Sequence, residues 1–137
     1  MSLSSTLHSS ARALEMLHEM LEFQQAGPVS AVLIGGDTSR ALRVALLGFD
    51  AHDLEFISPT ADGILVVRRE NEQTAQIWAE RVRLHHPTPL SVGVASGSSA
   101  IGMLAAASAA LRKAKSLGGQ LTIAATTLFD IENQRAA

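Results

Sequence analysis

The chain has 137 residues, of which 47% are hydrophobic and 18% charged, a composition typical of one globular domain with a proper core. Its net charge of −2 gives no basic surplus for a nucleic-acid-binding face, so nucleic-acid partners are not expected. The chain has no cysteine, so disulfides and thiolate metal sites are excluded. Its apolar runs are too short to span a bilayer, which predicts a cytoplasmic protein without a membrane partner.

The first predicted element is a helix over residues 6–26, and Met1 to Leu3 are interpreted as a candidate expression leader. The helix has apolar residues at helical spacing and ends at Gly27-Pro28. A strand over 30–34 follows. The next predicted helix is capped by Asp37, Thr38 or Ser39 and ends near Leu47, and strands over 54–58 and 64–68 follow it. A helix over 70–84 and a strand over 90–95 come next. The last two elements are an alanine-rich helix, which is capped by Ser98 or Ser99 and ends near Leu117, and a strand over 121–125.

The order of these elements predicts the fold. The middle block runs β-α-β-β-α-β, which is the connectivity of the split βαβ, or ferredoxin-like, unit. We therefore expect a single domain over 1–137 of the α/β (α+β) class, with an antiparallel-rich sheet of about five strands flanked by helices. The helices of the middle block would cover one face, and the turn at Thr60–Gly63 would project from one end of the sheet.

That turn belongs to the stretch PTADGILVV, residues 59–67. Asp-Gly is typical of a tight hairpin turn, and the apolar run that follows it favours a buried strand. Asp62 is the carboxylate at the tip. It is either a residual metal ligand or a turn residue, and the local pattern favours the turn residue.

Two later segments carry a resemblance to a known family. They are LSVGVA, residues 90–95, and AASAALRKAKSLGGQLTIA, residues 106–124. Together they resemble the GGDEF domain family, the diguanylate cyclases of bacterial cyclic di-GMP signalling, in which a strand like V-S-I-G-V-A precedes a helix like A-D-x-A-L-Y-x-A-K-x-x-G-R-N. The matching residues are Ser91, Gly93, Ala95, Ala107, Ala110, Leu111, Ala114, Lys115 and Gly118. The resemblance implies a fold of the nucleotidyl-cyclase type.

The resemblance also implies where the family's site would lie. The signature motif occupies the hairpin between the second and third strands, a position held here by Thr60, Ala61, Asp62, Gly63 and Ile64. In the family the acidic pair of this motif binds the metal and helps to activate a ribose hydroxyl. Gly63 replaces the glutamate, and Gly35 stands where a second metal-binding aspartate ends the first strand. Lys115, a phosphate contact in active members, is retained, although its position favours a solvated lysine near a helix C-terminus, stabilised by the helix dipole.

Further departures from the family pattern point away from catalysis. Ser108 replaces an aspartate, Arg112 a tyrosine and Gly119 an arginine, while the guanine-reading run is missing. The inhibitory R-x-x-D site is also absent, because Asp50 stands where its arginine would lie relative to Asp53. Joining two GTP molecules needs a divalent cation clamped by carboxylates, and magnesium demands near-octahedral oxygen ligation. We therefore expect no catalytic residue, no metal site and no cofactor, with nucleotide binding weak or absent.

The resulting hypothesis is a non-catalytic GGDEF-like regulatory or protein-interaction module in bacterial, cyclic di-GMP-type signalling. Two alternatives stay open: a divergent diguanylate cyclase with residual GTP binding or turnover, and a ferredoxin-like domain that binds a small effector. The expected partner is a protein, an adjoining signalling domain or a second copy of the chain. The first helix is apolar around much of its circumference, which fits core packing and a partner surface equally well. Its candidate interface residues are Leu14, Met16, Leu17, Met20, Leu21 and Phe23.

Overall fold

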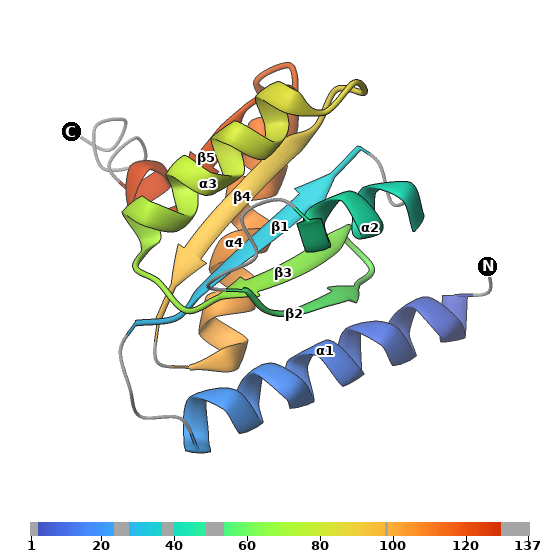
Figure 1. The fold of residues 1–137 in the computed structure, drawn as a ribbon. Coiled ribbons are helices and arrows are strands. Elements are labelled where there is room, and N and C mark those ends of the chain that lie inside the picture. Colours follow the sequence, from blue (N-terminus) through green and yellow to red (C-terminus); the bar gives the residue numbers. More distant parts are fainter. Residues whose placement is uncertain (1–2, 24–27, 37–39, 49–53, 98, 130–137) are drawn as a thin grey trace.

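The structure, a computed structural model, describes residues 3–23, 28–36, 40–48, 54–97 and 99–129. Within these ranges it contains one five-stranded sheet with helices on both faces (Figure 1). The elements are α1 (Leu3–Phe23), β1 (Ser30–Gly35), α2 (Arg40–Gly48), β2 (Leu54–Pro59), β3 (Ile64–Arg68), α3 (Glu72–His85), β4 (Ser91–Ser96), α4 (Ala100–Ser116) and β5 (Thr122–Ala124).

The strand order in the sheet is β2-β3-β1-β4-β5. β1 pairs antiparallel with β3 and β4, β2 pairs antiparallel with β3, and β5 joins β4 in parallel. This confirms the expected antiparallel-rich sheet. Ile34 pairs with Ile64 in the β1–β3 register, so the end of β1 lies beside the turn between β2 and β3. The turn at Thr60–Gly63 therefore lies at an end of the sheet, as predicted.

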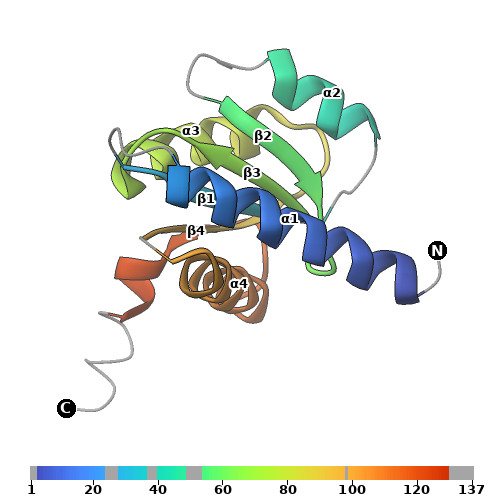
Figure 2. The same cartoon turned by 90° about the horizontal axis from the view of Figure 1, so that it is seen from below.

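Helices lie on both sides of the sheet (Figure 2), and each face of the sheet has its own core. Alternate residues of β1 and β3 point to opposite faces, because side chains in a strand alternate with a period of two. The first face packs against α2 and α3, and Trp78 of α3 is buried in this core. The second face packs against α1 and α4. The middle-block helices thus share one face, and the added helices cover the other.

Gly93 in β4 sets how closely α4 approaches the sheet. A Cβ atom built on Gly93 would lie 2.2 Å from the carbonyl oxygen of Ala107 and 2.5 Å from the backbone nitrogen of Leu111. No side chain fits between strand and helix there, so only glycine permits this contact. The glycine of the LSVGVA strand therefore has a packing role.

The ends of the helices are set by capping side chains. Asn71 accepts a hydrogen bond from the backbone nitrogen of Thr74 at 2.8 Å, so α3 begins at Glu72 instead of residue 70. Ser99 accepts one from Gly102 at 3.2 Å and caps α4, which resolves the choice between Ser98 and Ser99. The predicted cap residues of α2, 37–39, lie outside the described residues. No helix in the described ranges is both long and apolar enough to span a membrane.

Candidate functional site

The turn between β2 and β3 is closed by the side chain of Thr60. The backbone nitrogen and the hydroxyl of Thr60 both donate to the carbonyl oxygen of Gly63, at 2.7 and 2.8 Å. The backbone nitrogens of Asp62 and Gly63 donate in turn to the Thr60 hydroxyl oxygen, at 3.3 and 3.2 Å. The loop residues are therefore Ala61 and Asp62, and two amide groups at the tip are already satisfied within the turn.

Gly63 has a backbone conformation that a side chain would not tolerate. Its φ is +154°, and a Cβ atom there would lie 2.2 Å from the carbonyl oxygen of Ile34. Asp62 is not among the described residues with positive φ. Asp-Gly therefore does not supply the two central residues of a type I′ loop, which need positive φ at both positions. Thr60 provides the closure that the sequence assigned to Asp-Gly.

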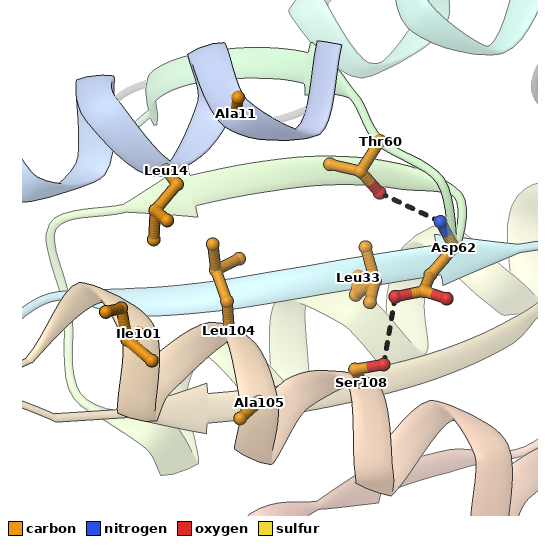
Figure 3. Close-up of a pocket in the computed structure, with 9 residues that line it drawn as sticks. All are labelled: Ala11, Leu14, Leu33, Thr60, Asp62, Ile101, Leu104, Ala105 and Ser108. Atoms are coloured by element: carbon orange, nitrogen blue, oxygen red, sulfur yellow. Dashed lines mark hydrogen bonds between the residues drawn. The ribbon is translucent and has the colours of Figure 1, made fainter. Parts of the chain in front are cut away.

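Asp62 is tied to α4 by a chain of hydrogen bonds (Figure 3). The hydroxyl of Ser108 donates to Oδ2 of Asp62 at 2.9 Å, and Nη1 of Arg112 donates to the Ser108 hydroxyl oxygen at 3.1 Å. The positions that depart from the family's helix pattern thus hold the turn in place. The sequence singled out all three residues, but it gave no signal that they interact.

Lys115 lies over the end of β1. A Cβ atom built on Gly35 would lie 2.9 Å from Cε and 3.1 Å from Nζ of Lys115. The ammonium group therefore sits where a side chain at position 35 would project. The structure brings together Asp62, Ser108, Arg112, Gly35 and Lys115 around one end of the sheet, because β1, the turn and α4 meet there.

The residues present do not fit a magnesium ion. The site offers the Asp62 carboxylate, which already accepts a hydrogen bond from Ser108, and the cationic end of Lys115 lies against the strand end. No group of three potential metal-binding side chains (His, Cys, Asp or Glu) is found within the part of the chain that the structure describes. Magnesium favours several hard oxygen ligands in near-octahedral geometry. Asp37, Asp50 and Asp53 lie outside the described residues.

A cavity of about 380 Å³ adjoins the turn, a feature that the sequence did not predict. It lies between α1 and α4, with Leu33 of β1 behind it (Figure 3). The residues that line it are Ala11, Leu14, Leu33, Thr60, Asp62, Ile101, Leu104, Ala105 and Ser108. No sequence pattern points to this cavity, although the structure shows that one of its lining residues, Ile101, is 70% exposed despite being large and apolar.

The candidate interface residues of α1 have different environments. Leu17 and Met20 are buried in the core beneath α1, so they are not available to another chain in this conformation. Leu14 and Leu21 are half-buried and pack against the same core, and Met16 is half-buried too. The side chain of Phe23 lies outside the described residues. The interface hypothesis therefore rests on the partly exposed members of the set.

No family model matches the sequence, and no curated protein is similar to it. Solved structures are similar in fold. The active GGEEF domain of a diguanylate cyclase from Vibrio cholerae superposes with a TM-score of 0.70 at 17% identity, covering 85% of this chain and 96% of that one. The GGDEF domain of DgcB from Caulobacter crescentus, in complex with cyclic di-GMP, gives a TM-score of 0.68 at 14% identity, covering 85% and 87%.

The fold class is thus a mixed α/β domain with a five-stranded sheet and helices on both faces. More specifically, it is the fold of the GGDEF domains of diguanylate cyclases, which confirms the resemblance carried by residues 90–95 and 106–124 at the level of fold. A structure containing the coiled coil and GGDEF domain of DgcB is also similar, with a TM-score of 0.63 at 15% identity, covering 82% of this chain and 75% of that one.

Proposed function

We propose that this chain is a non-catalytic GGDEF-like module with a regulatory or protein-interaction role in bacterial, cyclic di-GMP-type signalling. The similar solved structures include an active diguanylate cyclase domain and a domain bound to cyclic di-GMP, which supports this signalling context. A cytoplasmic location and an adjoining signalling domain belong to the same proposal. The coiled coil that accompanies the GGDEF domain of DgcB supports the second point.

The observation that carries the proposal is the backbone at Gly63. A glutamate at this motif position needs room for a Cβ atom, yet that atom would lie 2.2 Å from the Ile34 carbonyl oxygen and 2.9 Å from its carbonyl carbon. Real Cβ atoms do not approach backbone atoms so closely, so the acid has no place in the present turn. The difference from the family motif therefore involves the turn's backbone as well as its side chain.

The surroundings of Gly63 support the same conclusion. The Thr60 hydroxyl oxygen accepts from the amides of Asp62 and Gly63, whereas the family uses its open glycine backbone to approach the nucleotide. Lys115 lies against Gly35, so the end of β1 presents a cation where the family holds a metal ligand. A magnesium ion there would be repelled by the ammonium group without a carboxylate from position 35 to offset the repulsion.

The direct test is an assay for cyclic di-GMP formation from GTP with magnesium and with manganese. We expect no product from this chain under conditions in which the active Vibrio cholerae GGEEF domain turns over. Product that co-purifies with the protein and disappears in the Asp62→Ala variant would establish the alternative, a divergent cyclase. The retained Asp62 and Lys115 are the observations that favour this second candidate.

Residual nucleotide binding is a separate question from turnover. Calorimetry with GTP and with cyclic di-GMP, each with and without magnesium, measures it directly. We expect weak or undetectable affinity that magnesium does not increase, because the site lacks the carboxylates that would couple metal to nucleotide. Magnesium-dependent GTP binding that Asp62→Ala removes would contradict the proposed loss of the metal site.

A further inference from the structure

The cavity beside the turn has a mostly apolar wall. α1 contributes Leu14, β1 contributes Leu33 and α4 contributes Ile101 and Leu104 (Figure 3). Small-molecule sites are typically concave, about 300–1,000 Å³ in volume, and mainly apolar with a few placed polar groups. At about 380 Å³ this cavity lies within that range. Its wall is therefore suited to the apolar body of a small ligand.

The polar groups of the cavity are gathered at the turn. They are Thr60, Asp62 and Ser108, and two of these have their hydroxyl protons committed: Thr60 donates to Gly63, and Ser108 donates to Asp62. The Ser108 oxygen already accepts from Arg112. The carboxylate of Asp62 is exposed, and it accepts from Ser108 through Oδ2. Since an ionised carboxylate offers acceptor positions on both oxygens, Asp62 retains capacity for a donor supplied from the cavity.

We propose that this cavity binds a small ligand with an apolar body and a cationic amine or amidine head, the head pairing with Asp62 and the body lying against Leu14, Leu33 and Leu104. Charge decides the class of ligand, because Asp62 is the one ionisable group among the described residues that line the cavity. It repels phosphates and carboxylates and favours a cation that donates charge-assisted hydrogen bonds. The inference does not rest on the proposed function, since a cavity of this kind is compatible with either presence or absence of cyclase activity.

Benzamidine is a suitable probe, because its flat apolar ring carries a cationic head with paired N–H donors. Its neutral analogue benzamide keeps the ring and much of the shape without the charge. Each is titrated into the ¹⁵N-labelled full chain while the amide signals are followed by NMR. We expect saturable benzamidine shifts at Leu33, Asp62 and Leu104, and at least tenfold weaker binding of benzamide. Absence of saturable shifts, or equal binding of the two probes, overturns the proposal.

Three variants localise the effect. Asp62→Asn keeps the shape of the side chain but removes its charge, so benzamidine affinity should fall at least tenfold. Ala105→Phe places a ring in the cavity from an exposed position on α4 and should abolish binding. Glu22→Gln removes an exposed carboxylate of α1 that does not line this cavity, so it should leave affinity unchanged. Unchanged binding in Asp62→Asn or in folded Ala105→Phe, or a comparable loss in Glu22→Gln, contradicts the assigned site.

Discussion

Gly63 shows how one residue changes what a turn can do. Its side-chain direction is occupied by the backbone of β1, and its φ of +154° is unfavourable for any residue with a Cβ atom. We expect Gly63→Ala to lower the free energy of unfolding by at least about 1–3 kcal/mol, the usual size of such backbone strain. Urea unfolding measures the difference.

Gly48 provides the matched control for this prediction. It lies at the end of α2, and a Cβ atom there would meet nothing within 4 Å. Gly48→Ala should leave stability unchanged or raise it slightly, because it reduces the freedom of the unfolded chain without a clash. If Gly63→Ala is as stable as Gly48→Ala, the described geometry of the turn is wrong.

The sequence located the turn but not its contacts. Position 63 was recognisable as a substituted motif residue from the resemblance, since its place between two strands is a local property. The hydrogen bond between Ser108 and Asp62 joins residues 46 apart in sequence, and no periodicity predicts such a partnership. It exists because α4 packs closely on β4 at Gly93 and so brings Ser108 towards the turn.

Elements were predicted more reliably in their order than in their ends. β3 was expected and found at 64–68, because a buried run of apolar residues follows a turn signal there. The sequence predicts that α3 begins at residue 70, but Asn71 caps the helix and Glu70 belongs to the connection before it. Helix ends depend on individual hydrogen bonds, which hydrophobic periodicity does not reveal.

The junction between β3 and α3 contains a charged pair that the sequence did not flag. Arg68 and Glu70 lie two residues apart in a charged run that reads as surface, yet their side chains are 2% and 6% exposed. Nη2 of Arg68 lies 2.9 Å from Oε1 of Glu70, without the alignment of a hydrogen bond, and the guanidinium lies 4.3 Å from the ring centre of Trp78. The Ser30 hydroxyl donates to the Glu70 carbonyl oxygen, which ties the connection to β1.

Removing the Glu70 carboxylate should therefore lower the free energy of unfolding far more than removing a carboxylate from a more exposed ion pair. Glu70→Ala removes the carboxylate beside the buried Arg68 guanidinium, and removing one partner of a buried ion pair typically lowers the free energy of unfolding by about 3–5 kcal/mol. Chemical denaturation of the purified variant checks the prediction. A decrease of less than about 1 kcal/mol in the free energy of unfolding would mean that water reaches the Arg68–Glu70 pair in solution.

Glu55→Ala supplies the comparison on the neighbouring strand. Glu55 pairs with Arg69 at 2.6 Å, but these side chains are 23% and 35% exposed. Exposed ion pairs contribute about 0–1 kcal/mol, because water screens the charges and the long side chains lose freedom. If Glu70→Ala and Glu55→Ala lower the free energy of unfolding equally, burial does not strengthen the pair at this junction.

The whole molecule has unequal faces. On the first face α2 and α3 leave a hollow of only about 70 Å³, while on the second face α1 and α4 leave the cavity of about 380 Å³ beside the turn. The fold was predictable because the connectivity of strands and helices allows few topologies. The cavity was not, because it depends on how far apart α1 and α4 lie, a property of packing rather than of either helix alone.

The surface of α1 has two flanks with different surroundings. Leu14 and Leu21 line hollows between α1 and α4, whereas Met16 falls on the opposite flank, since successive helical residues turn by about 100°. α1 also contacts β2, the edge strand of the sheet. We expect the flank of α1 that carries Met16 to contact a second copy or an adjoining domain. Burying one large apolar side chain contributes roughly 1.5–3 kcal/mol, so a few such residues are enough to hold a weak dimer.

Sedimentation of the wild-type chain over a range of concentrations tests this interface. We expect self-association that Met16→Glu shifts towards monomer while the variant keeps a cooperative thermal transition, because Met16 is only half-buried. Ile101→Glu makes the same chemical change at an exposed residue of α4 and should leave the association intact. Leu17→Glu should unfold the domain, since Leu17 is fully buried. Two results together would contradict this interface: the wild-type chain stays monomeric at high concentration, and the Met16→Glu variant unfolds. Met16 would then belong to the core, and the case for a homodimer through α1 would be removed.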